Sequence, residues 1–349
     1  MTLYNMAINH FILLSGNDAE ATESLIPESP IPESPIPKNL TTLIPVVGAV
    51  AAVILLALCL FLFFRIRGKK KREAENMAAG NLPEIAPIGD VRVGKLHEQG
   101  AREGQQDCFG VSDQSLMRGR GLLAVVADGM GGLSDGDKVS AAAVSAVLDG
   151  FALYRGKCTQ EQQLLMLARQ AVEAVDELLG PSGYNKSGST LVMGLVRDSL
   201  FSFLSIGDSR ICLYRHGLLM QLNREHIFRN QLALDAINGE LPLQDAYTDS
   251  RSSGLTSFLG MGALEHIDMP ASPLRLIPGD KLLLMSDGVY NALNEEELIS
   301  SLKGSPEDVV SNLRQAILEK GFTNQDNYTA VILECMPVSS EEQARKEQE

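Results

Sequence analysis

Two hydrophobic patterns divide the chain. Residues 43–64 are uncharged and almost all apolar. A helix rises about 1.5 Å per residue, so this segment is long enough to cross the bilayer core of about 30 Å. After residue 92, short apolar runs alternate with longer stretches that have apolar residues at helical spacing. The pattern predicts a single transmembrane helix at residues 43–64 and a globular domain at residues 92–336.

Four stretches of the globular domain carry helical signals. In residues 137–154 and 161–179, apolar positions recur every three or four residues. Two further helices are predicted from their capping residues, Asn294 before three glutamates and Ser305 before a proline, with a glycine at the far end of the second. We expect the first pair to cover one sheet and the second pair to cover another.

Short apolar runs in the same domain predict strands. The clearest are residues 187–196, 200–206, 211–214, 218–222 and 328–335. Two groups of strands, each with its own helix pair, predict an α+β fold. The expected fold is a four-layer α-β-β-α sandwich of two antiparallel sheets flanked by helix pairs, preceded by the single transmembrane helix. Residues 223–253 lose the strand pattern and gain charge, so we expect a loop there.

The segments on the two sides of the predicted span differ in charge. Residues 1–42 carry five acids and one lysine and twice repeat Ile-Pro-Glu-Ser-Pro, which predicts an extended or disordered arm. Residues 65–91 form a basic juxtamembrane segment and linker, and its basic side chains are Arg65, Arg67, Lys69, Lys70, Lys71 and Arg72. Because basic residues mark the cytoplasmic side of a span, we expect a single-pass protein of the cell (inner) membrane. The arm would lie outside and the globular domain in the cytoplasm. Binding of the basic cluster to anionic lipid is the alternative.

Composition excludes some kinds of binding partner and of cysteine site. The net charge of −14 argues against a nucleic-acid partner. The five cysteines are isolated and none has C-x-x-C spacing. This spacing argues against a zinc knuckle or a disulfide framework and favours a reducing compartment. Residues 337–349 are a charged tail.

Aspartates beside apolar runs carry the candidate chemistry. The apolar residues 122–126 predict a strand that ends at Asp128, before a glycine-rich turn. A buried carboxylate is costly unless a charge pairs with it, and glycines let other groups approach closely. A divalent cation is one partner that fits, and a strand-to-helix turn capped by Asp128 is the alternative. Asp208, Asp287 and Asp326 also adjoin apolar runs. Carboxylates without histidine or cysteine suit magnesium or manganese rather than zinc.

Four short motifs occur in a characteristic order between residues 96 and 335. They are Asp128-Gly129-Met130-Gly131-Gly132, Gly207-Asp208-Ser209-Arg210, Ser286-Asp287-Gly288 and Asp326-Asn327-Tyr328-Thr329. Together they resemble the metal-dependent Ser/Thr protein phosphatases of the type 2C, or PPM, family in its bacterial form. The resemblance implies the same sandwich fold and hydrolysis of phosphoserine and phosphothreonine in proteins. It further implies that the partners are phosphorylated proteins, with a Ser/Thr kinase or its targets among them.

The resemblance also implies a set of metal ligands. Asp128 would bridge two Mn²⁺ or Mg²⁺ ions, with the carbonyl of Gly129 on one ion and Asp287 and Asp326 completing the site of the other. Asp208 matches the position that helps to hold a third, looser metal in bacterial members. In the family, water activated by the two ions attacks phosphorus directly, so no phosphoenzyme forms.

Arg102 and Asp107 are the predicted catalytic residues. In the family an arginine five residues before an aspartate clamps the substrate phosphate, and these two residues have that spacing. A guanidinium fork suits a phosphate dianion. His226 matches the histidine at the entry to the family's flap, where it could protonate the leaving group, or it is a plain polar loop residue.

Three departures from the family pattern keep a second function open. Gln105 stands for the usual asparagine, Ser257 for the usual arginine, and Asn223 for the usual threonine. Gln105, together with Gln106 in place of the glutamate of eukaryotic members, leaves metal geometry near Asp107 less defined. A catalytically silent, membrane-tethered binding or regulatory module is therefore the alternative. A calcium-binding structural domain is excluded, because no loop with alternating oxygen ligands is found.

Overall fold

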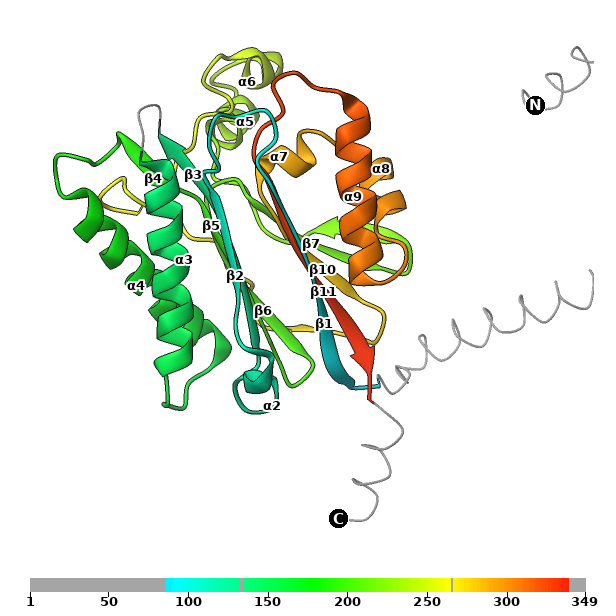
Figure 1. Ribbon diagram of the computed structural model, residues 1–349. Helices are drawn as coiled ribbons and strands as arrows, with labels where there is room; N and C mark the ends of the chain where they lie inside the picture. Colours follow the sequence, from blue (N-terminus) through cyan, green and yellow to red (C-terminus); the bar gives the residue numbers. More distant parts are fainter. Residues whose placement is uncertain (1–85, 132–134, 265, 339–349) are drawn as a thin grey trace, which may run out of the picture. The chain divides into compact units, whose positions relative to one another are not determined.

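The computed structural model describes residues 86–131, 135–264 and 266–338 (Figure 1). The predicted arm, the predicted span at residues 43–64, most of the linker and nearly all of the charged tail lie outside this range. Within the described residues, no helix has both the length and the apolar character that a membrane crossing requires. The predicted span is not part of that comparison.

One antiparallel sheet joins the two ends of the domain. Its strands, in spatial order, are β1 (Ile88–Glu98), β11 (Tyr328–Pro337), β10 (Lys281–Met285), β7 (Arg210–Arg215) and β8 (Leu218–Gln221). The first and last strands of the domain pair along ten residues of β1, from Ile88 opposite Pro337 to Glu98 opposite Tyr328, with one register shift near Ile88. β1 therefore begins four residues before the predicted domain start at residue 92.

The second sheet is also antiparallel. Its order is β2 (Asp107–Val111), β3 (Leu122–Gly131), β5 (Leu191–Arg197), β6 (Leu200–Ile206) and β9 (Leu274–Arg275), and β4 (Ser187–Ser189) pairs with the end of β3. The prediction that this apolar strand ends at Asp128 was wrong. β3 continues to Gly131, because β4 supplies backbone partners for Gly129 to Gly131. For the same reason the predicted strand at 187–196 is two strands that meet at Thr190.

The two sheets pack face to face between two helix pairs (Figure 1). Alternate residues of β3 show the layering: Leu122, Ala124 and Val126 lie in the core between the sheets, whereas the intervening residues lie in the core under the first helix pair. That pair is α3 (Gly136–Leu153) and α4 (Gln160–Leu179). The other pair is α8 (Glu295–Ser301) and α9 (Pro306–Lys320), which covers the outer face of the β1 sheet. The predicted four-layer arrangement is confirmed.

Local capping signals set the ends of the second helix pair. Asn294 and Ser305 each accept a hydrogen bond from the backbone N–H three residues later, and the side chain at that position returns the bond. Gly321 ends α9 in the left-handed conformation, at φ 62°. These capping predictions are confirmed.

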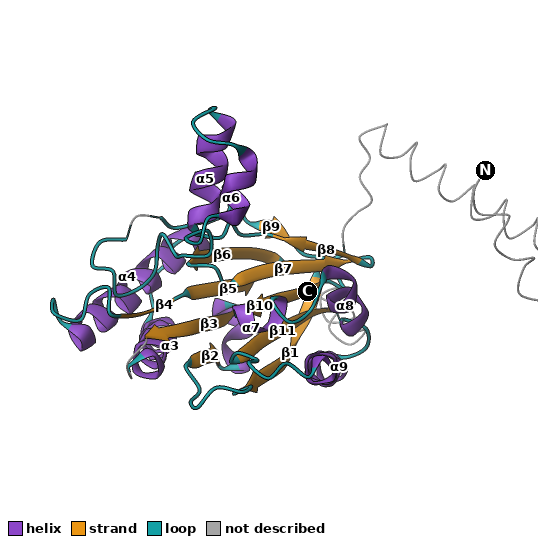
Figure 2. Ribbon diagram, turned by 90° about the horizontal axis from the view of Figure 1, so that it is seen from above, coloured by secondary structure: helices purple, strands orange, loops and turns teal. Residues whose placement is uncertain are grey.

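The remaining helices are short. The 3-10 turn Gln114–Leu116 and α2 (Met117–Arg120) connect β2 to β3, and α7 (Asp287–Tyr290) follows β10. Between β8 and β9 the chain forms α5 (Phe228–Ile237) and α6 (Leu243–Thr248), which lie side by side and project from the sandwich (Figure 2). Residues 223–253 thus lack strands, as predicted, but contain two helices that the sequence pattern did not indicate.

Candidate active site

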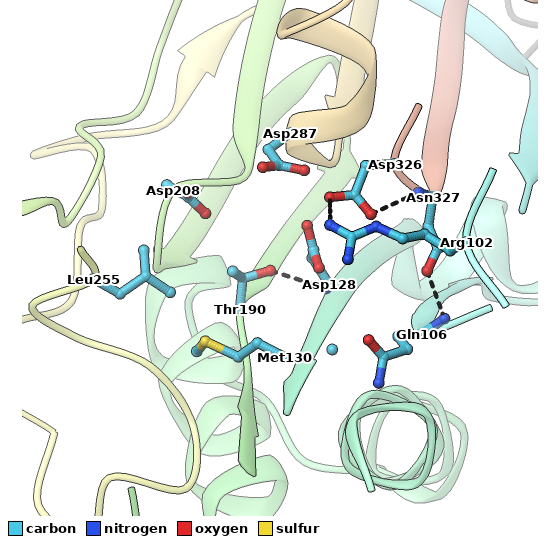
Figure 3. A pocket seen from close by; sticks show the side chains of 11 residues that line it. Arg102, Gln106, Asp128, Met130, Thr190, Asp208, Leu255, Asp287, Asp326 and Asn327 are labelled. Carbon is cyan, nitrogen blue, oxygen red and sulfur yellow. Dashed lines mark hydrogen bonds and ion pairs between the residues drawn. The ribbon is translucent and has the colours of Figure 1, made fainter. Parts of the chain in front are cut away.

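An open pocket of about 330 Å³ lies where segments from both sheets end (Figure 3). β3 and the turn after β6 reach it from one sheet, and the segments after β10 and before β11 reach it from the other. The lining residues are Arg102, Gln106, Asp128, Gly129, Met130, Thr190, Asp208, Leu255, Asp287, Asp326 and Asn327. Six of the seven residues that the sequence predicted for the site therefore share one cavity.

Asp128 is fixed by its strand neighbours. Its backbone N–H donates to Oγ1 of Thr190 (2.9 Å), and its carbonyl accepts bonds from the Thr190 N–H (2.9 Å) and the Ser189 hydroxyl (3.1 Å). Burial raises the pKa of Asp128 well above its ordinary value, and the charges of Asp107 and Asp287 add to this effect. A rigid backbone thus holds a carboxylate where its negative charge is disfavoured.

Two aspartates enter from the other sheet. Asp287 is the first residue of α7, and Asp326 lies in the loop just before β11. Burial, followed by the charge of Asp326, raises the pKa of Asp287. The charge of Asp287 in turn raises the pKa of Asp128, so the carboxyl groups from the two sheets influence one another's protonation.

Asp208 follows β6 on a tight turn. Gly207 has φ 99°, and a Cβ there would lie 2.7 Å from the Thr190 side chain, so only glycine fits. The Tyr290 hydroxyl donates to the Asp208 carbonyl (3.1 Å), and the guanidinium of Arg210 lies 3.6 Å from the Tyr290 ring centroid. Burial, then the charge of Asp287, raises the pKa of Asp208 to about 7.

His226 supports that turn and does not line the pocket. The ring Nδ1 of His226 accepts a hydrogen bond from the Gly207 N–H (3.1 Å), and the backbone N–H of His226 donates to the Gly207 carbonyl (2.9 Å). The side chain is buried, which lowers its pKa. His226 lies in a loop, as one of the two interpretations had it, but it is buried and hydrogen-bonded to the Gly207 turn, and its position gives no support to a role in protonating the leaving group.

Arg102 approaches from the loop between β1 and β2. Its Nη2 donates to Oδ2 of Asp326 at 2.6 Å, and this bond raises the guanidinium pKa further. The side chain is 58% exposed. Arg102 therefore borders the pocket with one face on Asp326 and the rest of the guanidinium accessible.

Asp107 is the predicted site residue that does not line the pocket. It lies opposite Asp128 in the β2–β3 register, only 5% exposed, and its Oδ2 accepts a hydrogen bond from the Ser286 hydroxyl (2.7 Å). Burial raises its pKa to about 6. Asp107 lies on β2 of one sheet, and Ser286 follows β10 of the other and precedes Asp287. Their hydrogen bond therefore joins the two sheets next to the pocket.

The donor set of the pocket fits hard divalent cations. Four carboxylates line it, and among its lining residues Arg102 alone is basic. Oxygen donors of this kind are those that magnesium and manganese prefer, and these ions keep several water ligands. In the described part of the chain no three His, Cys, Asp or Glu side chains form a ready-made metal cage. The residues would thus hold cations through protein oxygens and water together.

The three residues that depart from the family pattern all form side-chain hydrogen bonds. The Gln105 side chain accepts from the Asp107 N–H (3.0 Å), and the Ser257 hydroxyl donates to the His266 carbonyl (2.7 Å). Asn223 accepts from the Ile211 N–H (2.7 Å) and donates to two further acceptors. None of the three residues lines the pocket.

Three polar residues of the pocket, Gln106, Thr190 and Asn327, were not among the predicted site residues. Thr190 holds Asp128 as described above and shares a hydrogen bond with Ser209 (2.8 Å). Asn327 joins the pocket to the Arg102 loop through its side chain. The signal for Asn327 was its position next to Asp326, whereas Thr190 is marked only by its place at the start of an apolar run.

Solved structures share this fold. The PPM Ser-Thr phosphatase MsPP from Mycobacterium smegmatis, in complex with cacodylate, aligns with a TM-score of 0.58 and 28% identity over 71% of this chain and 99% of that one. The catalytic domain of the serine threonine protein phosphatase PstP in complex with two manganese ions aligns with a TM-score of 0.56 and 22% identity, over 70% of this chain and 98% of that one. The fold and the site define the class of Ser/Thr phosphatases.

Sequence comparison gives the family. The model of the protein phosphatase 2C family matches residues 93–325, and this chain belongs to that family. The serine/threonine phosphatase stp of Listeria monocytogenes is 28% identical over 218 residues, which are 61% of this chain and 84% of the relative. The human protein phosphatase 1B is 24% identical over 190 residues, 48% of this chain and 39% of the relative. The protein is a Ser/Thr protein phosphatase of the 2C type.

Proposed function

We propose that the pocket hydrolyses phosphoserine and phosphothreonine esters of proteins with two bound Mn²⁺ or Mg²⁺ ions. The observation that carries this proposal is the meeting of Asp128, Asp287 and Asp326 from two sheets in one pocket beside Arg102. Bound divalent ions supply Lewis acidity and lower the pKa of water. The protein would contribute the ligands, the phosphate clamp and the shape of the cavity.

Each residue has a defined part in this proposal. The Asp128 carboxylate, which lines the same pocket as Asp287, would serve both ions, and the Gly129 carbonyl would serve one of them. Asp326 would complete the site that it shares with Asp287, and Asp208 would bind a third, looser ion. The accessible face of the Arg102 guanidinium would bind two phosphate oxygens and orient the phosphorus in the cavity.

The test is phosphate release by the full-length protein. We expect hydrolysis of p-nitrophenyl phosphate and of a phosphothreonine peptide with manganese, and none after chelation by EDTA. Restoring manganese should restore the rate. If neither substrate is hydrolysed at any manganese concentration while the protein still binds phosphopeptide, the alternative of a silent binding module replaces this function.

We further propose that the phosphatase is tethered to the cytoplasmic face of the cell membrane through residues 43–64. The support is the uncharged run, the basic residues that follow it and the acidic arm before it. Substrates would then be phosphoproteins at the cytoplasmic membrane surface, including a Ser/Thr kinase or its targets.

Protease accessibility tests the orientation. A protease added outside intact cells is expected to remove the arm, residues 1–42, and to leave the domain after residue 64 whole, because the membrane would shield it. An epitope at each end, followed on blots, measures both fragments, and permeabilised cells give the control for cleavable sites. Cleavage of the domain in intact cells would show that the orientation is the opposite one. Recovery of the protein in the fraction without membranes would show that residues 43–64 do not tether it.

A further inference from the structure

The loop that carries Arg102, residues 99–106, has no regular secondary structure. Its backbone packs directly on the segment before β11. The Ala101 N–H donates to the Gln325 carbonyl (2.8 Å), and Gly100, at φ 64°, leaves so little room that a Cβ would lie 2.2 Å from the Asp326 carbonyl oxygen. The position of Arg102 therefore depends on contacts with the residues around Asp326.

Asn327 makes most of the side-chain contacts to this loop. It is 4% exposed, and its Oδ1 accepts a hydrogen bond from the Gln106 N–H (2.8 Å). Its Nδ2 donates to the carbonyls of Gln99 (2.7 Å) and Gly104 (3.0 Å). One amide thus holds the loop at its beginning and its end, with Arg102 between them, and Figure 3 shows its bond to Gln106.

A carboxamide of this length is needed for these contacts. Asparagine offers one acceptor and two donors, whereas aspartate has no donor when ionised and serine is too short to bridge three backbone groups. Within the loop, the Gln99 side chain donates to the Arg102 carbonyl (2.7 Å), which passes the restraint to Arg102 itself. None of the three bonds of Asn327 involves the guanidinium.

We propose that Asn327 is a positioning residue for phosphate recognition, acting through Arg102. It holds the loop so that the guanidinium borders the pocket beside Asp326. This inference rests on the proposed role of Arg102 as the phosphate clamp. Without the amide, the loop would lose three anchors and the guanidinium would spend less time at the phosphate position, although its charge would be unchanged.

A double-mutant cycle in the full-length protein tests this. With manganese, Asn327→Ala is expected to lower kcat/KM for p-nitrophenyl phosphate about tenfold or more, mainly through KM, and to weaken binding of inorganic phosphate measured by calorimetry. In the Arg102→Ala background the same substitution should change kcat/KM less than about twofold, because the residue it positions is gone. Equal losses in both backgrounds would show a role independent of Arg102 and overturn the proposal.

Hydrogen exchange gives a readout that does not depend on activity. In metal-free protein, Asn327→Ala should speed exchange across residues 99–106, including the Gln106 amide that bonds to Asn327. The control is Asn312→Ala, which removes two side-chain bonds to backbone carbonyls at the end of α8, far along the chain from the loop. It should alter neither exchange in the loop nor phosphate affinity.

A second substitution guards against a variant that does not fold. Gly100→Ala displaces the same loop from the Asp326 backbone and should reproduce the loss of phosphate affinity. If either folded variant keeps normal phosphate affinity and loop exchange, Asn327 does not position Arg102. If the wild-type protein neither hydrolyses nor binds phosphate, the proposed function fails, and the exchange measurement still decides whether Asn327 holds the loop.

Discussion

Asp128→Asn is expected to reduce manganese-dependent phosphate release about a thousandfold while raising the melting temperature of the metal-free protein. Asp128 lies opposite Asp107, and the charges of Asp107 and Asp287 disfavour its ionised carboxyl group, so its negative charge costs stability unless cations are bound. Asp287→Asn and Asp326→Asn should also abolish activity with the domain still folded. Steady-state kinetics and thermal unfolding of the same samples measure both effects.

The sign of the stability change follows from the pKa. Burial raises the pKa of Asp128 in the folded protein above its pKa in the unfolded chain. The carboxyl group therefore lowers the stability of the folded protein once the pH rises above the pKa of the unfolded chain. At pH 7 that cost is present, and the neutral amide removes it. We expect a gain of about 3 to 6 °C without metal, and the added stability from manganese should shrink.

Asp280→Asn is the matched control for Asp128→Asn. Asp280 is 1% exposed and accepts two hydrogen bonds from Arg215, at 2.7 and 2.6 Å. Its replacement should lower the melting temperature, because a buried partner is lost, and should spare the activity of the folded fraction. Wild-type rates in the Asp128→Asn protein would show that Asp128 is not part of the active site.

Arg102→Ala should lower kcat/KM about a hundredfold. The guanidinium would no longer bind two phosphate oxygens, and lysine at this position should restore only part of the loss, because an ammonium group lacks the planar fork. Manganese affinity should change less than about fivefold and towards tighter binding. The reason is that Arg102 contacts Asp326, a proposed ligand, through an ion pair that is largely exposed and therefore weak.

Arg314→Ala is the control for Arg102→Ala. Arg314 pairs with Glu98 at 2.7 Å, and its side chain is 42% exposed, so the substitution removes a comparable ion pair away from the pocket. It should leave kcat/KM and manganese affinity unchanged. An Arg102→Ala protein with a lower melting temperature but normal kcat/KM would mean that Arg102 is structural.

Local sequence signals predicted much of the fold. The capping residues Asn294 and Ser305 set the starts of α8 and α9, because the bonds they make reach only three residues along the chain. Apolar periodicity likewise gave α3, α4 and β6 to within a residue or two. The aspartates of the pocket were recognisable from their apolar neighbours and from the order of their motifs.

The sequence by itself determined the two helix pairs, most strands of the sandwich and the residue types that carry the chemistry, whereas the tertiary structure decided how they meet and revealed α5 and α6. Arg102 and Asp326 are 224 positions apart, and Asp107 and Ser286 are 179 apart. No periodicity extends over such distances. The pairing of β1 with β11 brings the first two residues together, and the packing of one sheet on the other brings the second two together. Pairing with β4 likewise extended β3 past Asp128. The three hydrogen bonds of Asn327 to the loop also depend on the tertiary structure, because their partners lie near the start of the domain in sequence and Asn327 lies near its end.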